Sequence, residues 1–147
     1  ALERLLPESG VAEIHCYHPQ PYYDPAEVGK RLVTPAFLAQ VHRRLAPGGK
    51  FFVQTDNPGY WRYIREVAPV FFDWSEQPGP WPDAPKGRTR REIVALRQGL
   101  PVYRAWGTPR PGLDFASASA RAAEMPAPTF DADRRLRALD AMEREGT

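Results

Sequence analysis

The first regular pattern along the chain is a run of apolar and β-branched residues at 11–17. A short run of this kind, bounded by turn residues, is typical of a strand buried in a parallel sheet. A proline-studded segment follows at 18–33, and then Thr34 and Pro35 supply an N-cap and a first helical residue. Apolar side chains at helical spacing predict a helix over 35–46. The pattern therefore predicts a strand, a loop and a helix.

The same alternation continues along the chain. The Pro-Gly-Gly turn at 47–49 ends the first helix, and residues 50–55 form the second predicted strand. Asn57 and Pro58 repeat the cap-and-proline start for a helix that runs through about residue 67. The pattern then predicts, in order, a strand at 70–74, a long surface loop at 75–88 containing Trp81, a short helix at 89–98 and a last strand at 100–106.

The two ends of the chain have a different character. Residues 1–6 have the pattern of the last turns of a helix without an N-cap, so we expect a further segment upstream. Residues 107–129 are rich in Pro, Ala and Ser, which predicts a linker or a disordered segment. Apolar side chains at helical spacing predict a C-terminal helix within 130–147. We expect three parts, namely a domain portion at 1–106, the linker and this helix.

Alternating strands and helices of this kind predict an α/β fold with helices on the faces of a sheet. No Gly-x-Gly-x-x-Gly follows any predicted strand, and no P-loop is present. The glycine-rich half of a nucleotide-binding fold is therefore absent from this sequence.

Composition and cysteine content narrow the class of protein. With 147 residues, 42% hydrophobic and 26% charged, the chain is one globular domain or less. No apolar run approaches the roughly 20 residues that cross a bilayer, and the N-terminus lacks a signal-peptide pattern. The single cysteine, Cys16, lies in a predicted strand, which indicates a core thiol and excludes a disulfide or a cysteine-based zinc site. We expect a cytoplasmic protein that does not enter a membrane.

Charge and loop position suggest where chemistry could lie. A net charge of +2 is too small to name a polyanionic partner, but residues 86–91 hold four cations and 42–44 three basic side chains. Such clusters suit phosphate contacts, although a solvated face explains each equally well. Ligands bind beyond the carboxyl ends of strands in open α/β sheets, so the segment 18–33 is the first candidate; the alternative is a Pro-rich surface connection. The three histidines are too scattered to predict a metal site.

Five short motifs occur along the chain in a recognisable order. Residues 17–22 read Tyr-His-Pro-Gln-Pro-Tyr and residues 30–38 read Lys-Arg-Leu-Val-Thr-Pro-Ala-Phe-Leu. Leu-Ala-Pro-Gly-Gly follows at 45–49, then Thr-Asp at 55–56 and Thr-Arg-Arg-Glu at 89–92. Over about residues 1–106 the chain thus resembles the C-terminal half of bacterial tRNA (guanine-N7)-methyltransferases, which use S-adenosylmethionine.

The resemblance implies a fold, and it implies which part of the family's domain this chain carries. The fold is the Rossmann-like class I methyltransferase fold, and this chain carries the C-terminal part of its mostly parallel sheet, with helices on both faces. The family's glycine-rich cofactor loop and its acidic cofactor-binding residues are expected upstream of residue 1. No cofactor-binding residue is therefore assigned in this chain.

Three positions depart from the family motif Pro-Asp-Pro-Trp-x-Lys. The family's Asp falls on Gln20, its Trp on Tyr22 and its Lys on Asp24, where an anion replaces a cation. These positions lie near the methyl acceptor in the family. The departures favour a relative whose active site has changed.

The chemistry of the reaction identifies candidate residues. Guanine N7 carries a lone pair and needs no base, so catalysis is mostly placement of a base taken out of its stack. Carboxylates accept well from the N1–H and N2–H₂ groups of guanine, which points to Asp56 and Glu92, with Thr89 in support. Gln20 is the catalytic candidate because its amide oxygen could accept from N1–H, more weakly than a carboxylate. Further substrate-binding candidates are Asp24 and Tyr22, the latter by stacking; candidates for the RNA backbone are Lys30, Arg31, Arg88, Arg90 and Arg91.

Structural roles are open for the same residues. Asp56 could accept backbone N–H bonds at the following helix start, and Thr89 with Glu92 forms a capping box in the sequence. Tyrosines such as Tyr22 more often pack than stack.

Taken together, the sequence predicts S-adenosylmethionine-dependent methylation of guanine N7 in tRNA, with this chain carrying the half that recognises guanine and tRNA. A diverged, non-catalytic relative that binds RNA or a partner subunit is the alternative. A methyltransferase for another small acceptor is a third hypothesis.

Overall fold

The computed structural model describes residues 9–22, 31–126 and 134–145 of the chain. Within them, strands and helices alternate as the pattern predicts. The elements are β1 (Val11–Tyr17), α2 (Pro35–Arg44), β2 (Leu45–Thr55), α3 (Pro58–Phe71), β3 (Phe72–Gln77), α4 (Arg90–Arg97), β4 (Tyr103–Pro109), α5 (Phe115–Glu124) and α6 (Arg134–Glu145).

The four described strands form one sheet in the order β1-β2-β4-β3. β1 pairs with β2 in parallel, whereas β4 is antiparallel to both β2 and β3. Three strands therefore run in the same direction, and β4 is inserted between two of them in reverse. The predicted α/β class is confirmed. The described sheet is less parallel than expected, however, because the inserted strand makes two of its three pairings antiparallel.

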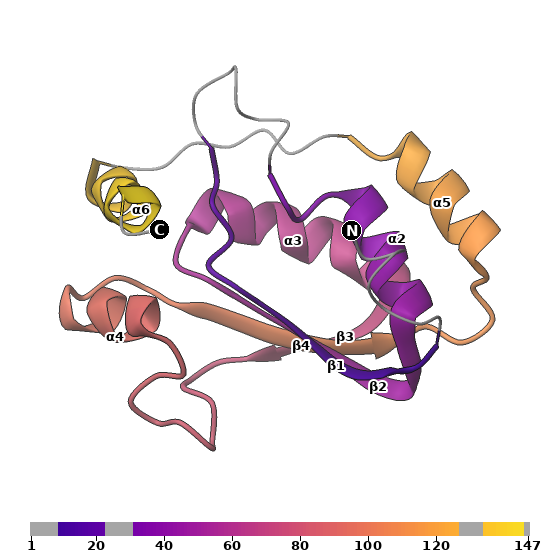
Figure 1. The fold of residues 1–147 in the computed structure, drawn as a ribbon, viewed down its shortest axis with the longest axis horizontal. Coiled ribbons are helices and arrows are strands. Elements are labelled where there is room, and N and C mark those ends of the chain that lie inside the picture. The colour runs from indigo at the N-terminus through magenta and orange to yellow at the C-terminus, as the bar shows by residue number, and fades with distance from the viewer. Residues whose placement is uncertain (1–8, 23–30, 127–133, 146–147) are drawn as a thin grey trace.

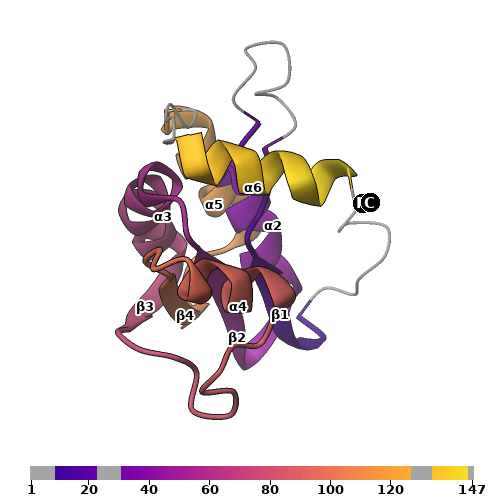
Figure 2. The ribbon, with the colours of Figure 1, turned by 90° about the vertical axis from the view of Figure 1, so that its left-hand side faces the viewer.

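The described helices cover one face of this sheet and one of its ends. Figures 1 and 2 show α2 and α3 along one face, with α5 outside α2, while α4 and α6 lie together at the end where β4 begins. Among the described residues, the helices that lie along the sheet in Figures 1 and 2 are therefore on one of its faces. The loop between β3 and α4 crosses the second face instead, and the Trp81 ring packs edge-on against Phe52 with ring centroids 5.6 Å apart. Trp81 is only 2% exposed, so the predicted surface loop is anchored by a buried indole.

The first helix starts and stops where the sequence predicts. The Thr34 hydroxyl accepts the Phe37 N–H at 3.2 Å, and Pro35 occupies the first helical position. Gly48 has a φ of +77°, which favours glycine. At Gly49 a Cβ would lie 2.9 Å from the Ala46 carbonyl oxygen and 3.0 Å from that of Ala12, so only glycine lets β2 start against β1.

The second helix is longer than predicted. Asn57 caps it through a 3.0 Å bond from the Tyr60 N–H, and it continues to Phe71 rather than ending near residue 67. Phe71 lies four residues after Val67 on the same face, and both are buried in the core. Burial of this extra turn outweighs the presence of Pro69 within it.

The segment 107–129, expected to be a linker or disordered, contains the end of β4 and the whole of α5. Asp114 caps α5 by accepting the Ser117 N–H at 2.7 Å. The alanine-rich face packs closely on α2, with Ala118 fully buried and the Arg43 guanidinium 4.2 Å from the centroid of the Phe115 ring. Small side chains here allow close helix packing, and alanine is the strongest helix former.

The predicted C-terminal helix is present as α6. Leu136 and Leu139 of α6 form a small cluster with Ala95 and Leu100 beside α4, separate from the main core. Among the described residues, no helix has the length and apolarity needed to cross a membrane.

Candidate functional site

Polar side chains gather where β1 and β2 end. His18 and Gln20 follow β1, Asp56 follows β2, and the first turn of α4 brings Arg91 and Glu92 to the same edge. This is the carboxyl edge of the two parallel strands, at the end of the sheet where α4 and α6 lie in Figure 1. Three of the motifs recognised in the sequence, those at 17–22, 55–56 and 89–92, therefore meet at this edge, as expected for a site in an α/β sheet.

The Arg91 guanidinium forms a bidentate salt bridge with the Asp56 carboxylate. Arg91 Nε donates to Asp56 Oδ2 at 2.7 Å, and Nη2 donates to Oδ1 at 3.0 Å. Asp56 is only 2% exposed. Burial raises the pKa of Asp56, but the nearby His18 ring and the Arg91 guanidinium outweigh it and hold this pKa below its ordinary value. Asp56 thus remains ionised inside the protein. The capping role open to it in the sequence belongs instead to its neighbour Asn57.

The C-terminal helix closes the other side of Arg91. Asp140 Oδ1 accepts from Arg91 Nη2 and Glu143 Oε2 from Nη1, each at 2.9 Å. The Gln20 amide also reaches α6, donating to the Asp140 carbonyl oxygen at 3.1 Å and to Glu143 at 3.4 Å. One guanidinium is therefore surrounded by three carboxylates, two of which come from α6.

Glu92 is the second buried carboxylate at this edge. It is fully buried, and Arg104 of β4 donates to it through Nε at 3.0 Å. Thr89 caps α4 by accepting the Glu92 N–H at 3.1 Å, while Glu92 Oε1 accepts the Arg88 N–H at 2.8 Å. Burial raises the pKa of Glu92, and Arg104 with the Arg88 N–H lowers it further than burial raises it. Thr89 thus forms its half of the predicted capping box, whereas the Glu92 carboxylate accepts from the Arg88 N–H rather than from that of Thr89 and is paired with Arg104.

A chain of hydrogen bonds ties His18 to the second face of the sheet. Trp81 Nε1 donates to Gln54 Oε1 at 2.6 Å, and Gln54 Nε2 lies 2.9 Å from His18 Nε2. His18 Nδ1 is 3.8 Å from Asp56 Oδ2. The backbone at His18 is also unusual, with a φ of +49°, a value that a non-glycine residue adopts mostly at turns and functional sites.

The arginines expected to hold the RNA backbone are mostly turned inward. Arg31 is buried and donates to the carbonyl oxygens of Pro21 and Tyr22. Arg91 is buried among carboxylates, so neither side chain is available to a phosphate in this arrangement. Arg88 lies on the second face of the sheet, pairs with Asp83 at 2.7 Å and stacks over Trp81 at 4.4 Å from the ring centroid. Only Arg90 of the described candidates is exposed. A cluster of cations in the sequence does not show which way each side chain points.

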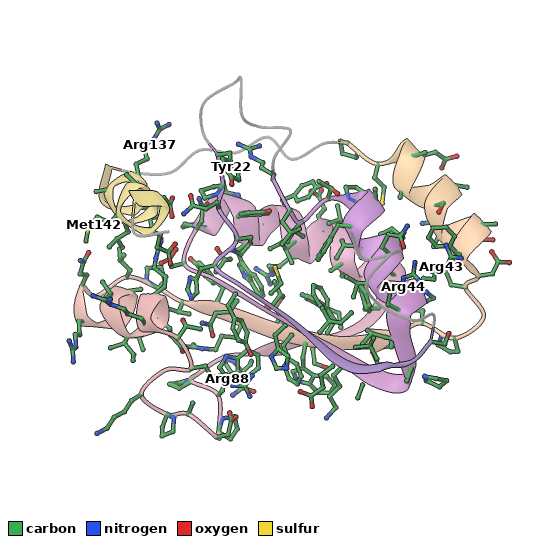
Figure 3. All side chains as sticks on the ribbon, in the orientation of Figure 1. Tyr22, Arg43, Arg44, Arg88, Arg137 and Met142 are labelled. Atoms are coloured by element: carbon green, nitrogen blue, oxygen red, sulfur yellow. The ribbon has the colours of Figure 1, made fainter. Side chains whose placement is uncertain are left out.

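The remaining candidates belong to the segment after β1. Tyr22 is half-buried with a φ of +48°, and Figure 3 shows it on the opposite side of the sheet from Arg88. Asp24 and Lys30 lie outside the described residues. Tyr22 and Arg88 therefore do not share one face of the sheet (Figure 3).

An apolar cavity of about 900 Å³ lies beside β1, between that strand, α2 and α5. Its walls include Cys16, Pro19, Phe37 and Phe115. Burial raises the pKa of the Cys16 thiol to about 12, so this cysteine is not a nucleophile. Among the described residues that line the cavity, none is a carboxylate that could bind the ribose hydroxyls or the amino group of S-adenosylmethionine. The described residues do not fit this cofactor by themselves. They also contain no group of three His, Cys, Asp or Glu side chains arranged for a metal ion.

Several residues of this edge were not singled out by the sequence. Gln54, Arg104, Asp140 and Glu143 all take part in the polar network through side chains distant in the chain. The spacing of Asp140 and Glu143, three residues apart on a predicted helix, was the one available signal, because it places two carboxylates on the same face.

Comparison with known proteins gives the class. A family model described as "Putative methyltransferase" matches residues 1–105. The match covers most of the chain, including both strands and the helix that build the carboxyl edge. The chain belongs to this methyltransferase family.

Curated proteins that are similar to this chain carry a more specific name. They include the tRNA (guanine-N(7)-)-methyltransferases of Alcanivorax borkumensis (32% identical, 67% of this chain and 41% of the relative), Paracoccus denitrificans (36%, 67% and 43%) and Cereibacter sphaeroides (37%, 67% and 42%). The chain thus spans less than half the length of these relatives. Helix α6 lies outside the residues that the family model matches.

Proposed function

We propose that this chain is the part of an S-adenosylmethionine-dependent tRNA (guanine-N7)-methyltransferase that recognises guanine and tRNA. Residues 1–106 would form the C-terminal portion of its methyltransferase domain. The observation that carries the proposal is the meeting of the family motifs around Gln20, Asp56 and Glu92 at one carboxyl edge, in a chain similar to curated enzymes of that name. The reaction would take place in the cytoplasm, which fits the single, buried cysteine.

The edge supports recognition of a base more than proton transfer. Because guanine N7 already has a lone pair, the protein must hold the base in place and accept its N1–H and N2–H₂ hydrogens. Asp56 is ionised and fixed by Arg91, so it is a preorganised acceptor. In the described arrangement α6 covers Gln20 and Arg91 beside it. Productive binding would therefore require α6 to move aside, and RNA would take its place.

Cofactor binding would come from residues outside the described part of the chain. S-adenosylmethionine supplies the methyl group when bound. The role of the described residues would be to place guanine in line with that group, with Asp56 as acceptor and the Gln20 amide oxygen facing N1–H. Asp24 and Tyr22 would complete the loop on the substrate side, and Lys30 and Arg90 would contact the RNA backbone.

Methyl transfer from labelled S-adenosylmethionine to a tRNA transcript tests the proposal. The protein would be the longest natural polypeptide that contains this chain. Wild type would be compared with Asp56→Asn and Glu92→Gln, and with Glu66→Gln as an exposed control. Label at guanine N7 that falls at least about 100-fold in Asp56→Asn, and is unchanged in the control, would support it. Full activity in Asp56→Asn would overturn the acceptor role.

A non-catalytic relative that binds RNA or a partner is the second candidate. Gln20 favours it, because a neutral amide stands where the family has a carboxylate, and its N–H₂ group is engaged by α6. Submicromolar tRNA binding without any methyl transfer by the wild type would support this candidate over the enzyme.

A further inference from the structure

The protonation of His18 can be derived from its neighbours, starting at Trp81. An indole N–H is a donor and cannot accept. Because Trp81 Nε1 lies 2.6 Å from Gln54 Oε1, the amide oxygen of Gln54 must face the indole. The orientation of the Gln54 amide is thereby fixed, and its nitrogen points the other way.

The Gln54 nitrogen then fixes the His18 ring. Gln54 Nε2 carries two hydrogens and no lone pair to offer, and it lies 2.9 Å from His18 Nε2. His18 Nε2 must therefore accept, which leaves it without a proton. The Gln54 amide also lowers the pKa of Glu92, as expected if its N–H₂ side, rather than its oxygen, faces that carboxylate. A neutral His18 ring in this position carries its proton on Nδ1.

The protonated nitrogen points at Asp56. The His18 side chain is 3% exposed, and Nδ1 has no hydrogen-bond partner among the described residues. Asp56 Oδ2 is 3.8 Å away, too far for a normal hydrogen bond but close enough for attraction to the charge. The backbone holds the ring there, because the His18 N–H donates to the Gln54 carbonyl oxygen at 2.7 Å. A buried donor without a hydrogen bond, such as His18 Nδ1–H, is rare in folded proteins and calls for an explanation.

We propose that His18 is a positioning residue, locked by Trp81 and Gln54 as the Nδ1–H tautomer so that its N–H holds the Asp56 carboxylate opposite Arg91. The Asp56 carboxylate then has the Arg91 guanidinium on one side and His18 Nδ1 at 3.8 Å on the other, and the attraction of both favours its present orientation when a substrate reaches it. The role of Asp56 toward a substrate rests on the proposed function. The tautomer of His18 and its interaction with the Asp56 carboxylate do not.

Nitrogen NMR of the histidine-labelled chain tests the tautomer directly. His18 is assigned by the signals lost in His18→Asn. We expect a protonated Nδ1 and an unprotonated Nε2 at neutral pH. Trp81→Phe removes the donor that orients Gln54, so the single tautomer should give way to a mixture. Trp106→Phe, on the same sheet face but outside the relay, should change nothing. A protonated Nε2 in the wild type would overturn the proposal without any variant.

The grip on Asp56 is tested by carbon NMR titration of its carboxyl group. Asparagine can place an N–H where His18 has Nδ1 and tolerates a positive φ, whereas glutamine and leucine cannot replace that donor. We expect the pKa of Asp56 to stay low in His18→Asn and to rise in both His18→Gln and His18→Leu. An unchanged pKa in those two variants would overturn the positioning role.

Kinetics then separate this inference from the proposed function. In the longest natural polypeptide, His18→Leu should lower kcat at least about tenfold, with little change in KM for tRNA, and His18→Asn should restore most of it. A wild type with no methyl transfer would refute the proposed function while leaving the two NMR results as the test of His18. Equal kcat in His18→Leu and wild type would overturn the catalytic consequence of the grip.

Discussion

At the scale of single residues, burial decides what an ion pair does. Arg91–Asp56 and Arg65–Glu76 have the same N–O distance of 2.7 Å. The first pair is almost completely buried, whereas the side chains of the second are 53% and 41% exposed. Water screens the exposed pair, but the loss of one partner from the buried pair leaves a charge without compensation.

Replacing Arg91 should therefore be costly. We expect Arg91→Ala to lower the free energy of unfolding by about 3–5 kcal/mol, because the Asp56 carboxylate would stay buried without its donor. Arg65→Ala, the matched control, should cost about 1 kcal/mol or less. Urea denaturation followed by tryptophan fluorescence measures both. Equal effects of the two substitutions would show that the paired hydrogen bonds between Arg91 and Asp56 are not formed.

The same carboxylates predict a pH dependence of stability. Asp56 and Glu92 have folded-state pKa values below their ordinary values of 3.8 and 4.5. Their contribution is fully present above those ordinary values and is lost as the pH falls toward the folded-state values. We expect unfolding free energy to drop as the pH is lowered from about 5 to 3. The drop should be smaller in Asp56→Asn, and a parallel pH profile in that variant would count against a shifted Asp56.

The position of this site could be predicted from the sequence better than the direction of its side chains. The motifs placed Asp56 and Glu92 at one edge because strand ends and helix starts are local features. The sequence could not show that the Arg91 side chain turns inward, because the Asp140 carboxylate that attracts it lies 49 residues away. Inward or outward direction of a cation depends on tertiary partners, which cation spacing does not encode.

At the scale of elements, α6 packs beside α4 through a small apolar cluster that is separate from the main core. Among the described residues, Leu136 and Leu139 join Ala95 and Leu100 there, with Val94 and Val102 packed against the cluster, and α6 also bonds to Arg91 and Gln20. So small a core contact stabilises the docked helix weakly. α6 should therefore open without unfolding the sheet.

Weakening the docking of α6 should expose the site. We expect Leu139→Ala with Asp140→Asn to raise amide hydrogen exchange in α6 at least about tenfold while strands β1 and β2 stay protected. If α6 covers the RNA site, the same variant should bind tRNA several-fold more tightly. Met142→Ala, at a position 66% exposed, is the control. Faster exchange throughout the sheet would show that α6 is part of the main core.

The β1–β2 junction depends on one glycine. A Cβ at Gly49 would lie 2.9–3.1 Å from three carbonyl oxygens, which are backbone atoms that cannot move alone. We expect Gly49→Ala to destabilise the protein by at least about 2 kcal/mol through a forced shift of the strand pair. Gly79→Ala, where a Cβ would meet nothing within 4 Å, should stay within about 0.5 kcal/mol of wild type. Thermal unfolding of both variants decides the matter.

Elements with strong local signals were predicted closely, and the others were not. β1 matches its predicted range, and the Thr34 and Asn57 caps start α2 and α3 as expected. α5 was missed because its alanines and serines carry no wide apolar face, and a helix of small residues gains its stability from close contact with α2. Composition alone cannot distinguish that helix from a linker.

At the scale of the whole molecule, two regions of the described structure differ in polarity, namely the carboxyl edge of β1 and β2 and the cavity beside β1. The carboxyl edge joins strands β1 and β2 to α4 and α6 through buried ion pairs. The apolar cavity beside β1 has the volume for a nucleoside-sized ligand but no carboxylate among its lining residues. Under the proposed function, the polar edge would contact the methyl acceptor, whereas the described lining of the cavity supplies no carboxylate for the cofactor.

This asymmetry predicts how the chain responds to S-adenosylmethionine. We expect calorimetry to detect no micromolar binding to the 147-residue chain, because the described lining of the cavity offers no carboxylate to the ribose hydroxyls or to the amino group, and burial of these groups without such partners costs their hydration. The curated enzyme from Paracoccus denitrificans, which is longer than this chain, is the positive control. Micromolar binding to the chain alone would contradict the prediction and place the cofactor among its own residues. Binding only by a longer natural polypeptide would assign the cofactor to residues outside the chain. Asp56, His18 and Arg91 would then act on the methyl acceptor alone, and their substitution should leave cofactor affinity unchanged while methyl transfer falls.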